Sequence, residues 1–242
     1  MKGPISRMFG RGAGCAFVVL LGFAVESQAQ VYTLTDGNSV AKINYNGPGG
    51  GNPGGMFYWG VQNTPATIQN QLFQQWFWYR VGNTDPEKPI DTLSPAALTG
   101  LGPNHVTTTY TDGPGRFNVG VTYTLQGGQF TSGNADITEQ IVINNTSGGV
   151  LPFHFFQYSD FNLGGDGAND FILLSRNGFT SRFNQTDQLD GANIVETTAT
   201  PNANHGEADL VPNTFTKLTD GFPTTLDDSK TNAFGDVAWA LE

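Results

Sequence analysis

The stretch FNVGVTYTL at residues 117–125 decides the fold, because apolar side chains alternate with small or polar ones along its whole length. One face carries Phe117, Val119, Val121, Tyr123 and Leu125. Successive side chains of a strand point to opposite faces, whereas a helix would need apolar residues every three or four positions. The stretch therefore predicts a β-strand with one buried face.

The same alternation extends outward from this stretch in both directions. Residues 135–144 carry apolar side chains at Ala135, Ile137, Ile141 and Ile143. Further strands are predicted at 31–34, 39–45, 56–61, 71–82, 105–111, 151–161, 171–176, 179–184, 192–199, 214–219 and 234–241, with an irregular segment at 85–103. Many short strands separated by glycine-rich turns predict an all-β protein, an antiparallel two-sheet β-sandwich of jelly-roll or supersandwich type. A closed barrel is the alternative.

The first 29 residues have the pattern of a secretory signal peptide. Basic residues precede the apolar run CAFVVLLGFA at 15–24, and Ser27-Gln28-Ala29 offers small residues at a cleavage site. We expect residues 30–242 to form a single β-sandwich domain. Because residues 237–241 resemble a strand with no tail after it, we also expect this domain to be cut short at its C-terminus.

Charge and cysteine content exclude several classes of function. Loss of residues 1–29 would remove three basic residues and Glu26, leaving 8 basic and 20 acidic residues and a net charge of −12. Such a surface repels phosphates, so we expect no nucleic-acid partner. The apolar run is too short to span a bilayer, so we expect no membrane span in the mature chain. The only cysteine, Cys15, lies in the leader, which leaves no thiol for a disulfide or a thiolate metal site.

Four segments carry a resemblance to a known group of proteins. They are QLFQQWFWYRVG at 71–82, FHFFQYSDF at 153–161, PNANH at 201–205 and GDVAWAL at 235–241. These segments resemble secreted bacterial proteins of the PEP-CTERM type, which usually end in a sorting tag. The resemblance implies secretion to the cell envelope or the extracellular matrix and implies no particular activity. The tag itself is absent from this sequence.

Glu139 interrupts the apolar face of its predicted strand. A lone buried carboxylate costs several kcal/mol, so Glu139 is expected to be paired, with Arg80 or Arg176 as partner, or to have a raised pKa. Alternatively it acts as a general acid together with Asp160 and His154, as in a carbohydrate-active enzyme with paired carboxylates. Asp136 is another candidate for the second carboxylate. The sequence contains no catalytic signature such as Gly-x-Ser-x-Gly.

The segment GGDGANDF at 164–171 suggests calcium as a cofactor. Glycines permit tight turns, and the oxygen atoms of Asp166, Asn169 and Asp170 suit a hard cation. The segment occurs once, whereas calcium-binding β-rolls use successive copies. A glycine-rich turn without metal is therefore the alternative interpretation.

Aromatic residues concentrate in the predicted strands at 71–82 and 151–161. Trp76, Trp78 and Arg80 share one face of the first, and Tyr158 lies on the second. Such side chains either pack in a core or form an exposed platform for sugar rings. We expect a secreted envelope or matrix protein that binds extracellular carbohydrate or matrix components without catalysis. The alternatives are the carbohydrate-active enzyme and a calcium-stabilised adhesin.

Overall fold

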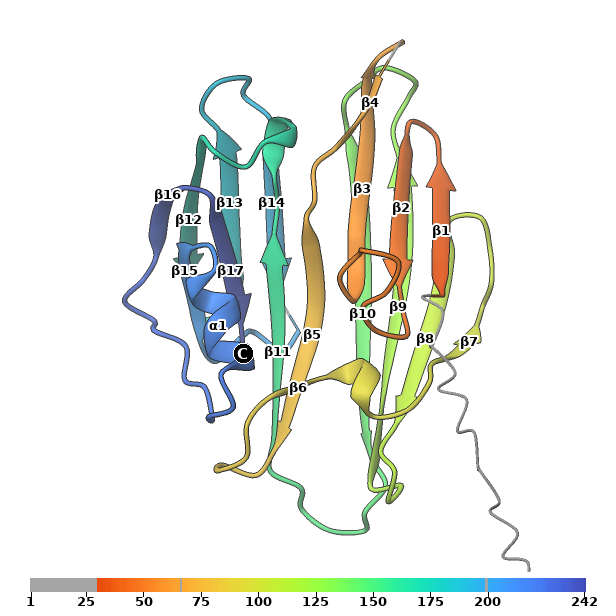
Figure 1. The fold of residues 1–242 in the computed structure, drawn as a ribbon, viewed down its shortest axis with the longest axis vertical. Helices are drawn as coiled ribbons and strands as arrows, with labels where there is room; N and C mark the ends of the chain where they lie inside the picture. The colour runs from red at the N-terminus through yellow and green to blue at the C-terminus, as the bar shows by residue number, and fades with distance from the viewer. Residues whose placement is uncertain (1–29, 66, 199) are drawn as a thin grey trace, which may run out of the picture.

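A computed structural model of the protein describes residues 30–65, 67–198 and 200–242. Its largest element is a nine-stranded sheet, drawn in front in Figure 1. The spatial order of this sheet is β1 (Val31–Asp36), β2 (Ser39–Asn44), β3 (Gly55–Thr64), β5 (Gln74–Val81), β11 (Phe153–Asp160), β17 (Val237–Leu241) and β15 (Gly206–Leu210). Outside this order, β4 (Thr67–Asn70) pairs with β3 and β6 (Lys88–Pro89) pairs with β5.

Two four-stranded sheets form the second layer behind the large one (Figure 1). The first has the order β10 (Ala135–Asn145), β9 (Phe117–Gly127), β8 (His105–Thr111) and β7 (Ala97–Thr99). The second has the order β14 (Asn193–Thr198), β13 (Ser181–Asp187), β12 (Asp170–Arg176) and β16 (Asn232–Gly235). Strand β9 contacts β1 and β2, and β12 contacts β15 and β17. The predicted antiparallel all-β fold is confirmed, with a second layer divided into two sheets.

The core lies between the two layers, as the alternation at 117–125 predicts. The five apolar side chains of β9 are at most 1% exposed. Phe117 packs against Tyr79 of the large sheet with ring centroids 5.6 Å apart. On the other half of the molecule, Trp239 stacks on Phe161 and Phe183. Each fully buried ring of this kind contributes about 2 kcal/mol or more through burial alone.

The prediction of a strand at 214–219 is wrong, because this segment forms the helix α1 (Asn213–Thr219). Its three threonines and Phe215 are residue types that favour a strand. The buried residues are however Thr214 and Leu218, four positions apart on one helical face. Phe215 packs edge-on against Trp78 and Tyr158, so the helix covers the aromatic face of β5 and β11. Tertiary packing overrides the local pattern here.

Two further predictions need correction at the strand level. Residues 234–241 belong to two strands in different sheets, because β16 ends at Gly235, with a φ of 125°, and β17 begins at Val237. The segment at 85–103, expected to be irregular, contains β6, β7 and the short 3-10 helix η1 (Ile90–Thr92). A second 3-10 helix, η2 (Leu163–Gly165), follows β11.

The expected leader at residues 1–29 lies outside the described residues. No helix within the described part of the chain has the length and apolar character that crossing a membrane requires.

Strands β3 and β5 diverge from each other, and this divergence shapes the surface between them. They pair only at Met56 and Gln75. Gly55 permits this contact, because its φ is +91° and an added Cβ would lie 2.4 Å from the carbonyl oxygen of Gln75. Beyond the contact, β4 and residues 71–73 occupy the space between the two strands.

Candidate functional site

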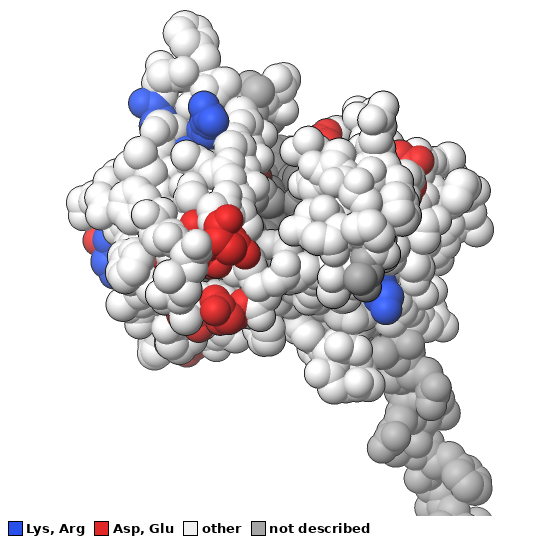
Figure 2. Space-filling view, turned by 90° about the horizontal axis from the view of Figure 1, so that it is seen from above, with Lys and Arg blue, Asp and Glu red and all other residues white. Residues whose placement is uncertain are grey.

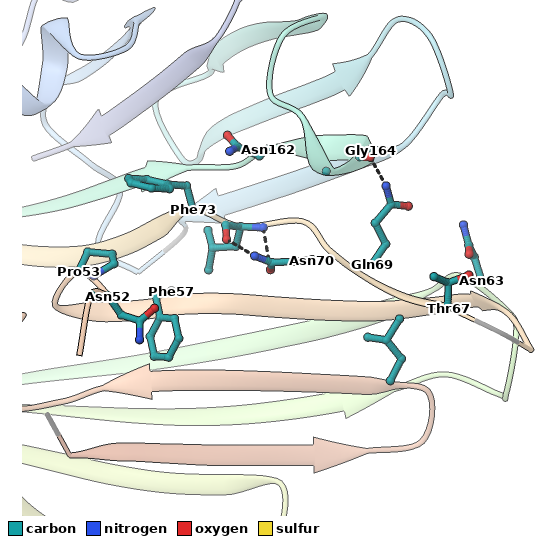
Figure 3. Close-up of a pocket in the computed structure, with 14 residues that line it drawn as sticks. Asn52, Pro53, Phe57, Asn63, Thr67, Gln69, Asn70, Phe73, Asn162 and Gly164 are labelled. Atoms are coloured by element: carbon teal, nitrogen blue, oxygen red, sulfur yellow. Dashed lines mark hydrogen bonds between the residues drawn. The ribbon is translucent and has the colours of Figure 1, made fainter. Parts of the chain in front are cut away.

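A hollow in the surface formed by the described residues lies where β3 and β5 diverge. It has a volume of about 650 Å³, within the range of small-molecule sites. Its walls come from the loop after β2, from β3 and β4, and from the η2 turn (Figure 3). The lining residues are Gly51, Asn52, Pro53, Phe57, Asn63, Thr67, Ile68, Gln69, Asn70, Leu72, Phe73, Asn162, Gly164 and Gly165. We refer to this hollow as the amide pocket.

None of the lining residues of the amide pocket is titratable. Its polar groups are side-chain amides, one threonine hydroxyl and backbone groups. Its apolar groups include Phe57, Ile68 and Phe73, of which Phe73 is 52% exposed. Amides donate and accept hydrogen bonds at the same time, while an exposed ring offers a flat apolar face. This combination suits a ligand that carries hydroxyl groups on an apolar ring.

Two of the amides hold the pocket in shape. Asn70 accepts hydrogen bonds from the backbone amides of Trp59 and Leu72 and donates one to the carbonyl of Leu72 (Figure 3). Gln69 donates to the carbonyl oxygen of Gly164 and so ties β4 to the η2 turn. Both side chains are fixed by the fold before any ligand arrives.

Three other amides are available for a ligand. The side chains of Asn52, Asn63 and Asn162 make no hydrogen bond to other drawn lining residues (Figure 3). Asn52 lies beside Phe57 at one end of the pocket, and Asn162 lies near Phe73 (Figure 3). A ligand in the hollow would therefore meet amide groups from the loop after β2 and from the η2 turn together.

Carboxylates surround the η2 turn on the side away from the pocket. A Cβ on Gly164 would lie 2.3 Å from Oδ2 of Asp187 and 2.8 Å from Oδ2 of Asp190. The backbone amide of Leu163 donates to Asp170, and Asp166 is exposed at the end of the turn. Seen from the end, acidic side chains gather on one lobe beside the hollow between the two lobes (Figure 2). The pocket itself is neutral, but one of its walls is negatively charged.

Burial raises the pKa of the acids behind this wall. Asp160 is 3% exposed, and burial together with the nearby Asp236 raises its pKa to about 7. Burial also raises the pKa of Asp170 to about 6, against the hydrogen bond from Gln185. These carboxyls keep their protons to higher pH than exposed acids do.

The predicted calcium ligands lie in this region but have other roles. Asp166 accepts a hydrogen bond from the amide of Ala168, as in a turn. Asp170 is fully buried and accepts hydrogen bonds from Leu163 and Gln185. Among the described residues, no group of three or more histidines, cysteines or acids could hold a metal ion.

Glu139 faces inward, but its neighbour is another acid and neither predicted arginine. Arg80 pairs with Glu87 at 2.7 Å, and Arg176 pairs with Asp228. Glu139 accepts hydrogen bonds from Gln75 at 2.9 Å and Gln157 at 3.3 Å. It lies on β10, the edge strand of the first small sheet.

Glu196 lies on β14, the edge strand of the second small sheet, and accepts a hydrogen bond from Ser159 at 2.9 Å. Ser159 is directly opposite Gln75 in the large sheet. Glu139 and Glu196 therefore contact neighbouring residues of the large sheet, although they come from two different small sheets. Burial first, and then the charge of Glu196, raise the pKa of Glu139 well above its ordinary value. Burial raises the pKa of Glu196 to about 7. We call this pair the seam acids.

The other predicted catalytic residues lie apart from the seam acids. Asp160 accepts a hydrogen bond from Tyr158 and belongs to the opposite face of β11. Nδ1 of His154 lies 2.6 Å from the carboxylate of Glu242, and Nε2 lies 3.1 Å from Asn83. Asp136 is exposed and accepts a hydrogen bond from Thr138. The three predicted catalytic residues do not converge in one cleft.

The predicted sugar platform lies in the interior. Trp76, Trp78, Arg80 and Tyr158 are each at most 5% exposed. Trp76 donates to Asp91, while Trp78 and Tyr158 pack beneath α1. The exposed ring of the candidate site is Phe73, which lies on the same segment of sequence. The sequence offered one signal for this pocket, the glycine- and proline-rich stretch at 46–55, because such loops often border binding sites.

The fold and the pocket together define an antiparallel β-sandwich with a neutral, amide-lined surface hollow. No family model matches the chain, and no curated protein matches its sequence. Among solved structures, the chain is similar to a bacterial glucoamylase determined in complex with acarbose. The TM-score is 0.60 at 8% identity, and the match covers 89% of this chain and 30% of that chain. At this identity the similarity shows the fold alone.

Proposed function

We propose that this protein is an exported, non-catalytic module that binds extracellular carbohydrate in the amide pocket. The observation that carries the proposal is the lining itself, which combines free amides with an exposed ring and lacks any titratable side chain. Sugar hydroxyls are both donors and acceptors, as amides are, and the apolar face of a sugar ring stacks on an aromatic ring. Without an acid, a base or a nucleophile among its walls, the pocket offers binding and no acid–base chemistry.

Two further points support the proposal. One solved structure with a similar fold over 30% of its own chain is named a glucoamylase. The leader-like sequence at 1–29 and the resemblance to secreted envelope proteins favour a role outside the cell. We infer that the protein reaches the cell envelope or the extracellular medium and meets its ligand there.

Catalysis by paired carboxylates is the competing function, and the seam acids are the pair that would perform it. One carboxyl oxygen of Glu139 and one of Glu196 are closed off from solvent and have no hydrogen-bond partner. A glycosidase needs its acid and its second carboxylate open to the substrate on both sides of the scissile bond. The geometry of the described residues therefore favours binding.

The test is isothermal titration calorimetry with two neutral hexasaccharides, cellohexaose and maltohexaose. We expect Phe73→Ala to weaken binding about fivefold to tenfold, which corresponds to roughly 1 kcal/mol for the lost ring contact. Asn162→Ala should weaken it to a similar extent by removing a free amide. Phe179→Ala is the matched control, because Phe179 is 83% exposed and lies outside the pocket. Equal affinity for all four proteins would refute the proposal.

A further inference from the structure

The η2 turn is a wall of the amide pocket on one side and a contact surface for carboxylates on the other. Gly164 and Gly165 line the pocket. Gly164 also approaches Asp187 and Asp190 so closely that no Cβ would fit between them. A group bound against Gly164 is therefore separated from these carboxylates by little more than the backbone.

No positive charge compensates these acids within the described part of the chain. The ion pairs formed by its lysine, arginine and histidine side chains use other carboxylates, namely Glu87, Asp112, Asp209, Glu207, Asp228 and Glu242. Asp166 and Asp190 are exposed, so their field reaches the solvent beside the pocket. The end-on view shows acidic side chains gathered on one lobe beside the hollow (Figure 2).

We propose that the acidic wall makes the amide pocket selective, so that it accepts uncharged sugar units and rejects units that carry a carboxylate. This inference rests on the proposed function and names the class of sugar that the same site takes. Asp166 and Asp190 are the residues that determine the selectivity. They act through the field at the pocket and make no contact with the ligand.

The size of the effect follows from Coulomb's law. If two carboxylates lie about 7 Å from a ligand carboxylate in a medium close to water, they weaken its binding by roughly tenfold at low salt. The same interaction is largely screened when the Debye length falls to a few ångströms. An amine-bearing sugar would experience the opposite effect and bind more tightly than the neutral one.

The test compares cellohexaose and maltohexaose with their C6-oxidised uronate forms, which have the same backbone and differ in charge. In about 20 mM salt, where screening is weak, we expect the uronates to bind about tenfold more weakly than the neutral sugars. In about 0.5 M salt the difference should disappear. The double variant Asp166→Asn with Asp190→Asn should remove the difference at low salt, because asparagine keeps the turn hydrogen bonds of both residues.

The matched control is Asp85→Asn with Asp220→Asn, which removes the same charge from two exposed positions outside the pocket. This control should leave the selectivity unchanged. Uronates that bind as tightly as neutral sugars at low salt would overturn the selectivity. A control variant that reduces the difference between uronates and neutral sugars as much as the Asp166→Asn, Asp190→Asn variant would also overturn it. If no hexasaccharide binds at all, the proposed function fails, and the selectivity fails with it.

Discussion

The seam acids lead to an unusual dependence of stability on pH. The perturbation is a rise in pH from 5 to 8. Burial raises the pKa of Glu196 from 4.5 to about 7, so the folded protein keeps this proton over a range in which the unfolded chain has lost it. The pKa of Glu139 is raised in the same direction. Stability from these groups is therefore fully present below about pH 4.5 and is lost as the pH rises towards 7.

The magnitude follows from the shift of Glu196. A difference of about 2.5 pH units corresponds to roughly 3 kcal/mol of unfolding free energy. Asp160 and Asp170, with pKa values raised to about 7 and about 6, add to the loss in the same range. The acids whose pKa is lowered, such as Asp209 beside Lys230, act in the opposite sense, but only below about pH 4.

The assay is urea unfolding of the wild type and of Glu196→Gln at pH 5, 6, 7 and 8. The wild type should lose several kcal/mol of unfolding free energy between pH 5 and 8, whereas the variant should lose about 2.5 kcal/mol less, because part of the Glu196 contribution is already lost at pH 5. Asp136→Asn is the control, since Asp136 is exposed on the same strand as Glu139. Wild-type stability that is flat or rises over this range would refute the reasoning, as would a variant with the same slope as the wild type.

Three substitutions test the packing that supports the site. Glu87→Gln should cost roughly 3 kcal/mol of unfolding free energy in urea, because it leaves the buried Arg80 without its partner charge. An unchanged midpoint would contradict the buried ion pair. Gly55→Ala should destabilise the protein by more than about 2 kcal/mol in the same assay, because it combines a positive φ with a clash against β5. Gly82→Ala, with a positive φ but open space, should cost clearly less, and equal losses would argue against the close approach of the strands. Leu218→Ala should lower the unfolding free energy in a thermal unfolding assay by about 2–4 kcal/mol, because Leu218 is 1% exposed on the buried face of α1. A loss below about 0.5 kcal/mol, which is typical of a surface residue, would contradict the helix.

The sequence predicts most strands because their alternation is local. The stretch at 117–125 and the stretch at 135–144 correspond to β9 and β10 within two residues at each end. The helix α1 was not predicted, because its three threonines and Phe215 favour a strand, whereas the helical face is set by the packing of Phe215 on Trp78. Local patterns therefore fix the strands but not the elements that cover them.

The candidate site was only partly predictable, for a different physical reason. Glu139 is recognisable as an acid on an apolar face, and the structure places it inward. Its neighbour Glu196 lies on another sheet, and no local pattern links two edge strands that share no backbone hydrogen bonds. The amide pocket draws residues such as Asn52 and Asn162 from distant segments, and amides give no sign in sequence of whether they face a ligand or the solvent.

The proposed function depends most on the amide pocket as the place where sugar would bind. The direct measurement is a nuclear magnetic resonance titration that follows the side-chain amides of Asn52 and Asn162 while cellohexaose or maltohexaose is added. If sugar binds in the amide pocket, these amides and the backbone amides of Phe73 and Gly164 should show saturable shifts, with little change at β8 and β9. Shifts centred elsewhere on the surface, or no shifts with either sugar, would contradict it.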